Sequence, residues 1–357
     1  MRHVRSSGRG AAAETHEAFE TIEEDWEALA EDLAAPPWYR AGWFVPWWSA
    51  FGRGDLRILA LRRDGRVLAV VPLMASAAHL ESASNWHTPE FGMLGEADAV
   101  SELAETLFAK ARRSITFSFV EPAAAQDVLA PASSRHRYRF LRRPLERSPY
   151  IDIAGDWAEY ERERPSKLLS NLRSRRRKLE QQGSLTFDVS DGRDRLDALL
   201  DEGFAVEAAG WKGNAGTAIS SATETERFYR EIARWAAARG WLRLGFLRLG
   251  TRALAFDLAI EHAGVHYLLK TGFDPEFSRF GTGVILRYEM IARAFAEGLR
   301  CYDFLGDEAD WKLNWTHTVR ERLRFQAFAP SLAGTVEWAA FAYGRPAAKR
   351  LLATLRR

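Results

Sequence analysis

The sequence predicts an α+β fold made of two similar halves, each with a mixed sheet flanked by helices. The chain has 357 residues, 47% of them apolar, which is enough for two cores. In each half, strands are followed by a helix and then by another strand. We expect a disordered N-terminus at 1–17, halves at 18–145 and 150–330 joined through 144–156, and a basic C-terminal helix at 331–357.

The first half begins with helical spacing near residues 18–33 and continues with an aromatic helix at 38–51. A hairpin follows at 56–73. It turns at Asp64-Gly65, a dipeptide that favours the tight turn of a two-residue hairpin. Another strand is expected near residues 114–120.

The second half begins with a basic helix at about 166–182, a strand at 185–189 and a helix at 193–208. A helix at 225–239 then leads into three strands at 242–249, 253–261 and 265–270, joined by short glycine-containing turns that predict a meander. A further helix runs from about 284 to Gly298, and the next strand is expected at 299–305.

The segment Gly281-Thr282-Gly283 precedes that last helix. Glycines allow a ligand to approach the backbone closely, and the first N–H groups and the dipole of a helix favour an anion such as a pyrophosphate. The alternative is an ordinary turn before a helix.

Several separated motifs resemble one known family. The run 269–283, the segment Asp303-Phe304-Leu305-Gly306-Asp307-Glu308 and the segment Trp311-Lys312-Leu313-Asn314-Trp315 are similar to the acetyltransferase domain of CelD/BcsL-type proteins. That family belongs to the Gcn5-related N-acetyltransferase (GNAT) superfamily and is related to Fem-type transferases. The resemblance extends over about residues 19–328 and includes the basic helix and the segment 207–219.

The chain departs from the family pattern at two places. The family often has Ser-Pro-Gly where this chain has Gly281-Thr282-Gly283, and Tyr-Lys where it has Trp311-Lys312. The superfamily's commoner phosphate signature has Arg or Gln where Ser278 stands, and Arg279 follows one position later.

The resemblance implies a duplicated GNAT-like fold and an acyltransferase that moves an acyl group from a thioester donor to an amine. We expect acyl-CoA as co-substrate, no permanently bound cofactor, and a lipid amine such as a sphingoid base, or a sugar, as acceptor. The donor-binding residues would be Arg279, Gly281, Thr282, Gly283 and Val284. Two alternatives are a Fem-like enzyme that uses aminoacyl-tRNA and a non-catalytic accessory protein of exopolysaccharide or envelope biosynthesis.

Acyl transfer needs a base for the attacking group and a positive or hydrogen-bonding group for the developing oxyanion. Our candidates for catalysis are Glu207, Asp307, Glu308 and Lys312. Candidates for substrate binding are Trp211, Lys212, Lys270, Asp274 and Trp311. Each charged candidate has the alternative of a structural ion pair. His262 and His266 flank a turn and are expected at the surface, and no spacing predicts a metal site.

Fifty basic and 48 acidic side chains give a net charge of +2, which argues against nucleic-acid binding through bulk charge. The basic helix at 166–180 has two interpretations, a solvated helix face or a contact with phosphate groups. The single cysteine, Cys301, lies in a predicted core strand and is expected to be an inert buried thiol, consistent with a reducing cytoplasm.

No apolar run is long enough to span a membrane, and the first residues lack the apolar core of a secretory signal. Residues 335–357 combine apolar side chains with five basic ones. Two interpretations remain open: a terminal helix packed on its domain, or a basic amphipathic helix lying peripherally on an anionic inner membrane face.

Overall fold

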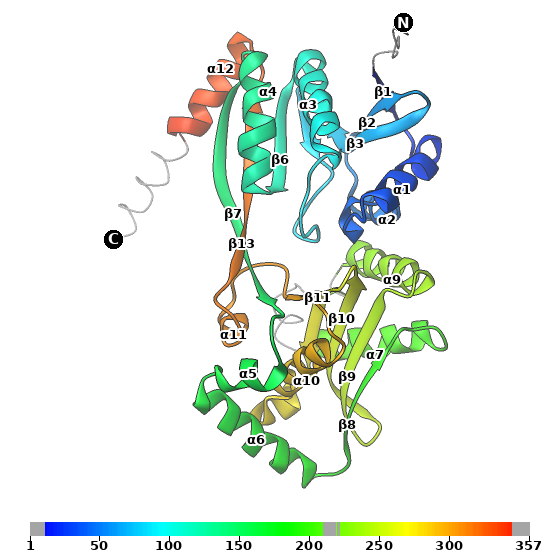
Figure 1. Ribbon diagram of the computed structural model, residues 1–357, viewed down its shortest axis with the longest axis vertical. Helices are drawn as coiled ribbons and strands as arrows, with labels where there is room; N and C mark the ends of the chain where they lie inside the picture. The colour runs from blue at the N-terminus through cyan, green and yellow to red at the C-terminus, as the bar shows by residue number, and fades with distance from the viewer. Residues whose placement is uncertain (1–10, 210–218, 220–221, 345–357) are drawn as a thin grey trace, which may run out of the picture. The chain divides into compact units, whose positions relative to one another are not determined.

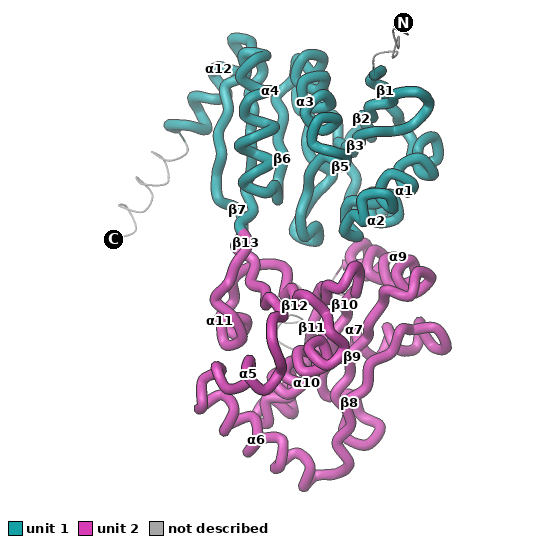
Figure 2. Tube along the Cα trace, in the orientation of Figure 1, with its two compact units in different colours: residues 1–146, 321–357 teal, residues 147–320 magenta. Residues whose placement is uncertain are grey.

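The computed structural model describes residues 11–209, 219 and 222–344 (Figure 1). Contacts divide the chain into two units, shown in Figure 2: unit 1 contains residues 1–146 and 321–357, and unit 2 contains residues 147–320. Each unit has strands with parallel and antiparallel neighbours and its own helices, so the predicted mixed α+β architecture is confirmed. The two predicted sheets join in one 13-stranded order, because the long strands β7 (Arg139–Asp152) and β13 (Val319–Phe328) are neighbours.

Unit 1 contains strands in the order β1-β2-β3-β4-β6-β13, followed by the first part of β7 (Arg139–Asp152), with β5 beside β3. Its strands are β1 (Ala12–His16), β2 (Asp55–Arg63), β3 (Arg66–Ala75), β4 (His79–Ser82), β5 (Leu94–Gly95), β6 (Ser114–Val120) and most of β13 (Val319–Phe328). Its helical segments are η1 (Phe19–Thr21), α1 (Glu23–Asp32), η2 (Pro37–Tyr39), α2 (Ala41–Phe51), α3 (Ala97–Ala111), η3 (Ala124–Leu129), α4 (Ala130–Arg135), α12 (Leu332–Ala339) and η6 (Ala340–Gly344). The tryptophan-rich α2 buries Trp43 and Trp47 completely, so these indoles are core residues.

Unit 2 contains a sheet in the order β7-β12-β11-β10-β9-β8. Its strands are the end of β7 (Arg139–Asp152), β8 (Leu185–Ser190), β9 (Leu242–Leu249), β10 (Arg252–His262), β11 (Val265–Phe273) and β12 (Cys301–Asp303). Its helical segments are α5 (Trp157–Arg162), α6 (Ser166–Glu180), α7 (Leu196–Ala209), α9 (Thr223–Ala238), η5 (Pro275–Phe280), α10 (Thr282–Ala296) and α11 (Asp310–Leu313).

The two halves of the sequence repeat one order of elements. The series β1, α1, α2, β2, β3, β4, α3, β6 has the same order as β8, α7, α9, β9, β10, β11, α10, β12. The pairing also repeats, since three antiparallel pairs are followed by one parallel pair, β4 with β6 and β11 with β12. The structure therefore shows the duplication that the sequence predicts only from its element pattern.

Each set of strands is extended by a strand from the other half of the sequence. Strand β13 pairs antiparallel with β6, and the end of β7 pairs antiparallel with β12. Our predicted boundaries are therefore displaced. The expected joint at 144–156 lies largely within β7. The expected second half at 150–330 includes β13, but most of this strand belongs to unit 1. Backbone pairing over a long sequence separation leaves no local signal.

The expected disordered N-terminus is wrong for the part that the structure describes. Residues 12–16 form β1, which pairs with β2 from Ala12↔Arg62 to His16↔Ile58. The pattern Ala-Ala-Glu-Thr-His has no apolar alternation that would identify an edge strand. Within the described ranges, no helix has the length and apolar character needed to cross a bilayer.

In unit 2, helix α10 covers one face of the sheet and α7 the other. The apolar stripe of α10, with Ile285, Leu286, Met290 and Ile291, is buried in the core as its spacing predicts. On the opposite face, Gly203 of α7 lies so close to Phe256 that a Cβ there would be 2.3 Å from the ring. Neighbouring Asp257 instead contacts α10, because successive strand residues point to opposite faces.

Candidate functional site

Strands β11 and β12 form a fork. They pair in parallel over only three positions, from Val265↔Cys301 to Tyr267↔Asp303, and β11 then continues through residues 268–273 without β12. A bulge at Leu269 disturbs the register of β11 with β10 just beyond that point, and bulges increase strand twist. Here "the fork" means residues 268–273 of β11 and the chain that leaves β12 at residues 304–313.

Chain conformation explains why β12 is shorter than the strand expected at 299–305. Leu305 and Gly306 have positive φ values of 47° and 58°, which turn the backbone out of the sheet. The buried ammonium of Lys312 donates to the carbonyl oxygens of Leu305 (2.5 Å) and Asp307 (2.6 Å). The Asp303 carboxylate accepts from the amide of Leu305 at 2.9 Å. Lys312 thus holds this turn in place, a structural role for a residue that we predicted to be catalytic.

The N-terminus of α10, residues 281–284 and here called the mouth of α10, contains most of the predicted donor-binding residues. Gly281 adopts the left-handed conformation at the helix N-cap (φ 63°), and its carbonyl accepts from the amides of Val284 and Ile285. Thr282 is completely buried, and its hydroxyl has no hydrogen-bond partner among the described residues. A Cβ added at Gly283 would lie 3.3 Å from Phe273, so this position packs against the end of β11.

Helix α6 brings a cation to the same mouth. A Cβ added at Gly281 would lie 2.8 Å from Nη1 of Arg175. Arg175 is exposed, and it forms no ion pair with any residue that the structure describes. A guanidinium beside the positive end of a helix dipole is unfavourable until an anion joins them. The basic helix, for which a solvated face was the alternative, therefore contributes one charge at a defined place.

Two other predicted residues, in the segment 274–280 that leads into α10, have local partners. Asp274 caps η5 by accepting from the amide of Glu276 at 3.0 Å, and its other oxygen accepts from Arg252 at 2.5 Å. Its carboxylate is thereby committed to holding the loop. Arg279 is exposed and stacks over Phe280 at 4.7 Å.

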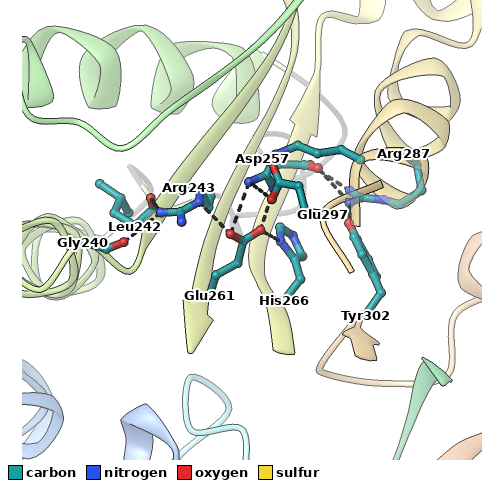
Figure 3. Close-up of polar contacts among 10 residues, drawn as sticks. Gly240, Leu242, Arg243, Asp257, Glu261, His266, Arg287, Glu297 and Tyr302 are labelled. Carbon is teal, nitrogen blue, oxygen red and sulfur yellow. Dashed lines mark hydrogen bonds and ion pairs between the residues drawn. The ribbon is translucent and has the colours of Figure 1, made fainter. Parts of the chain in front are cut away.

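Beneath the fork lies a buried polar network, shown in Figure 3. Arg287 of α10 is 1% exposed and pairs with the fully buried Asp257 of β10 at 2.7 Å. Its guanidinium also donates to the hydroxyls of Tyr302 and Thr271, and it lies 5.5 Å from the ring of Trp311. This one side chain therefore contacts both arms of the fork, β11 through Thr271 and the departing chain through Trp311.

The network continues to the far end of β10. Nδ1 of His266 lies 2.9 Å from the carboxylate of Glu261, which also accepts from Arg293 at 2.6 Å. The His266 ring stacks on Tyr302 at 4.5 Å. Burial lowers the pKa of His266, and its Nε2 has no partner among the described residues, which indicates a neutral ring protonated at Nδ1. Burial raises the pKa of Glu261, but the hydrogen bonds from His266 and Arg293 outweigh it and bring this pKa down to about 2. The expected surface position of His266 is wrong.

Glu207 of α7 lies against the other face of β11. This carboxylate is 1% exposed and accepts from the amide of Ile219 at 2.8 Å. A Cβ added at Gly272 would lie 2.4 Å from the Cα of Glu207, so α7 approaches the fork closely here. Lys270 lies 4.9 Å from the ring of Tyr229. Burial first, and then the charge of Glu207, raise the pKa of Tyr229 far above its usual value.

The structure does not bring all four predicted catalytic residues together. Glu207 lies against the α7 face of β11, whereas Trp311 and Lys312 lie by the α10 face. Glu308 is paired with Arg147 at 2.6 Å, and the Asp307 side chain is 87% exposed. Trp211 and Lys212 lie outside the described residues.

Three residues of this region were missed by sequence reasoning: Arg287, Asp257 and Tyr229. A signal existed for two of them. Arg287 occupies the buried stripe of α10 between Gly283 and Met290, and Asp257 interrupts an otherwise apolar strand. A charged residue within an apolar face predicts a buried partner of opposite charge. Nothing local distinguishes Tyr229 from an ordinary amphipathic helix residue.

Cys301 is buried as expected, and burial raises the pKa of its thiol to about 11. The thiolate form that a nucleophile requires is therefore disfavoured at neutral pH.

Known structures similar to this chain share its fold. A putative lysylphosphatidylglycerol synthetase C-terminal domain from Agrobacterium fabrum has a TM-score of 0.57 at 12% identity, covering 89% of this chain and 94% of that one. FemX has a TM-score of 0.57 at 14% identity, covering 88% and 96%. L-PGS from Bacillus licheniformis has a TM-score of 0.56 at 14% identity, covering 87% and 94%. At these identities the likeness shows the fold alone, and comparison with curated proteins finds no match.

A family model covers most of unit 2. Residues 166–313 match the model described as "Acetyltransferase (GNAT) domain". The matched segment begins at the first residue of α6 and ends at the last residue of α11, so it contains the fork, the mouth of α10 and Glu207. Residues 166–313 of unit 2 are therefore similar to a GNAT acetyltransferase domain.

Proposed function

We propose that the protein is an N-acyltransferase that takes its acyl group from an acyl-CoA and transfers it to an amine on a lipid or sugar acceptor, in the manner of CelD/BcsL-type proteins. The observation that carries this proposal is the fork, together with the positive mouth of α10 at its end. Residues 268–273 of β11 offer a strand edge that β12 does not occupy, where the amide groups of a pantetheine arm would find backbone partners.

Groups suited to an anion at the mouth of α10 support one orientation of the donor, with its pyrophosphate at that mouth. The first amides of α10, the buried hydroxyl of Thr282 and the guanidinium of Arg175 lie at one place, and a CoA pyrophosphate would supply the missing negative charge. The thioester would then lie farther along β11, toward the point where β12 leaves it.

The chemistry assigns the base role to Glu207. An acceptor amine would attack the thioester carbonyl, form the C–N bond and release a thiolate as the C–S bond breaks. Glu207 approaches β11 at the fork, while Glu308 is held in an ion pair and Asp307 is solvated. A protonated carboxyl is a stronger acid than a thiol, so the proton that Glu207 takes from the amine can pass on to the departing thiolate. The phenol of Tyr229, kept protonated by burial, is our candidate to donate a hydrogen bond to the leaving sulfur.

Donor binding can be tested with CoA and with pantetheine, which lacks the pyrophosphate. Because Arg175 is solvent-exposed, its contact with phosphate is worth about 1 kcal/mol, so Arg175→Ala should weaken CoA binding roughly fivefold. Pantetheine binding should stay unchanged. Arg177→Ala is the matched control, an exposed arginine on the same helix that points to another side. Equal CoA affinity of the wild type and Arg175→Ala would reject the mouth of α10 as the donor site.

A polyanionic donor, aminoacyl-tRNA, is the second candidate, and the exposed cations Arg173, Arg177 and Lys178 of α6 favour it. Thermal melting with CoA, palmitoyl-CoA and tRNA in parallel separates the two, because a ligand of the folded state raises the melting temperature. Stabilisation by tRNA alone would replace the acyl-CoA proposal, and no shift with any ligand would favour a non-catalytic protein.

The base is tested by Glu207→Gln, with Glu308→Gln as control. We expect a loss of turnover of about a hundredfold or more for Glu207→Gln, with CoA affinity retained. Equal turnover of the two variants would reject Glu207 as the base.

A further inference from the structure

The outer face of the last described helix in unit 1 carries apolar side chains in a row. Leu332, Val336 and Tyr343 are 84%, 63% and 67% exposed, and Ala340 is exposed between them. These four residues, here called the outer face, recur at the spacing of one helix side over α12 and η6. Large exposed apolar residues grouped in this way commonly mark an interaction surface.

The opposite side of this helix is fixed to unit 1, so the outer face is not the side that packs on its own domain. The carboxylate of Glu337 lies 2.9 Å from Nε2 of His79 and accepts from the hydroxyl of Ser114 at 2.6 Å. Gly334 is buried, and a Cβ there would lie 2.1 Å from the carbonyl oxygen of Ala329. These contacts orient the outer face toward solvent.

The outer face itself carries no charged side chain. Glu337 is the one charged residue between 331 and 344, and it is engaged on the inner side. The exposed Arg139 of β7 lies over the ring of Trp338 at 4.6 Å. The sequence that follows, 345–357, contains five basic residues and no acidic one.

We infer that this outer face binds an anionic membrane surface peripherally. An apolar helix side, with Arg139 beside the same helix and a basic sequence directly after it, has the two components of such binding: apolar area to bury and positive charge to attract acidic lipid head groups. A second copy of the chain is less suited to the face, because stable protein interfaces use roughly 20–30 residues a side and the outer face has four. The inference concerns unit 1 and does not depend on the reaction proposed for unit 2.

Vesicle sedimentation of the full-length protein tests it, using phosphatidylcholine vesicles with and without about 30% phosphatidylglycerol. We expect binding only to the anionic vesicles, and weaker binding in high salt. Leu332→Ser with Val336→Ser should lower the partition coefficient roughly tenfold, since two apolar side chains leave the membrane. Trp86→Ser is the matched control, because Trp86 is 68% exposed elsewhere in unit 1.

A second readout does not depend on these serine variants. Cys301 is buried, so a dye attached to Val336→Cys labels the outer face selectively in the native protein. Its emission should shift to the blue with phosphatidylglycerol vesicles, whereas the same dye on Trp86→Cys should not respond. The inference is overturned by equal binding to neutral vesicles, by unchanged binding of the serine variant, or by a concentration-dependent dimer that this variant abolishes.

Discussion

Replacement of Arg287 by methionine tests whether the network beneath the fork is held by its buried ion pair. Methionine keeps most of the side-chain volume but leaves Asp257, which has no solvent exposure, without its cation. Two unit charges about 4 Å apart attract by about 4 kcal/mol at an effective dielectric constant of 20. The hydrogen bonds to Tyr302 and Thr271 are lost as well. We expect Arg287→Met to lower the free energy of unfolding by about 3–5 kcal/mol.

Urea denaturation followed by tryptophan fluorescence measures this change. The double variant Arg287→Met with Asp257→Leu removes both charges and should recover most of the loss, because apolar pairs of similar volume replace buried ion pairs at little cost. Arg234→Met is the control, since Arg234 pairs with Asp197 at 2.7 Å on the exposed side of α9, and it should cost at most about 1 kcal/mol. A loss below about 1 kcal/mol for Arg287→Met, with no recovery in the double variant, would refute the reasoning.

Three further predictions concern the same unit. Lys312→Met should destabilise the protein by about 2 kcal/mol in urea denaturation, because two carbonyl groups of the turn after β12 lose a charged donor; an unchanged midpoint would mean that the turn holds without it. The lowered pKa of His266 means that its ring stays neutral when folded and gains a proton when unfolded, so stability should fall as pH drops below about 6.5. His266→Gln should flatten this dependence, and an equally steep pH profile would contradict the assignment. Cys301 should react with a thiol reagent only on unfolding, because it is buried and its pKa is raised to about 11; rapid labelling of the native protein would show otherwise.

Much of the fold follows from local patterns that need no partner. The hairpin turning at Asp64-Gly65 is present as β2 and β3, with positive φ at both turn residues, because this dipeptide tolerates that conformation. The helix after Gly281 and the strands of the meander also follow their hydrophobic periods. The exchange of β7 and β13 between the halves has no such pattern, since it depends on which distant strand offers an open edge.

The candidate site divides in the same way. Gly281 and its neighbours were predicted from chemistry that the backbone itself carries, and the structure places them at a helix mouth beside Arg175. The roles of Lys312 and Asp274 were not predictable, because the same residue types serve a substrate or a loop depending on which carbonyl or arginine lies nearby.

The sequence by itself determined the element types, the doubled α+β architecture and the glycine-bearing helix start, because propensity and periodicity act over a few residues. Only the tertiary structure decided where β12 leaves β11, which carboxylate packs against β11 and which charges pair in the core. Those outcomes depend on distances between residues far apart in the chain, and such distances exist only after the sheet has formed.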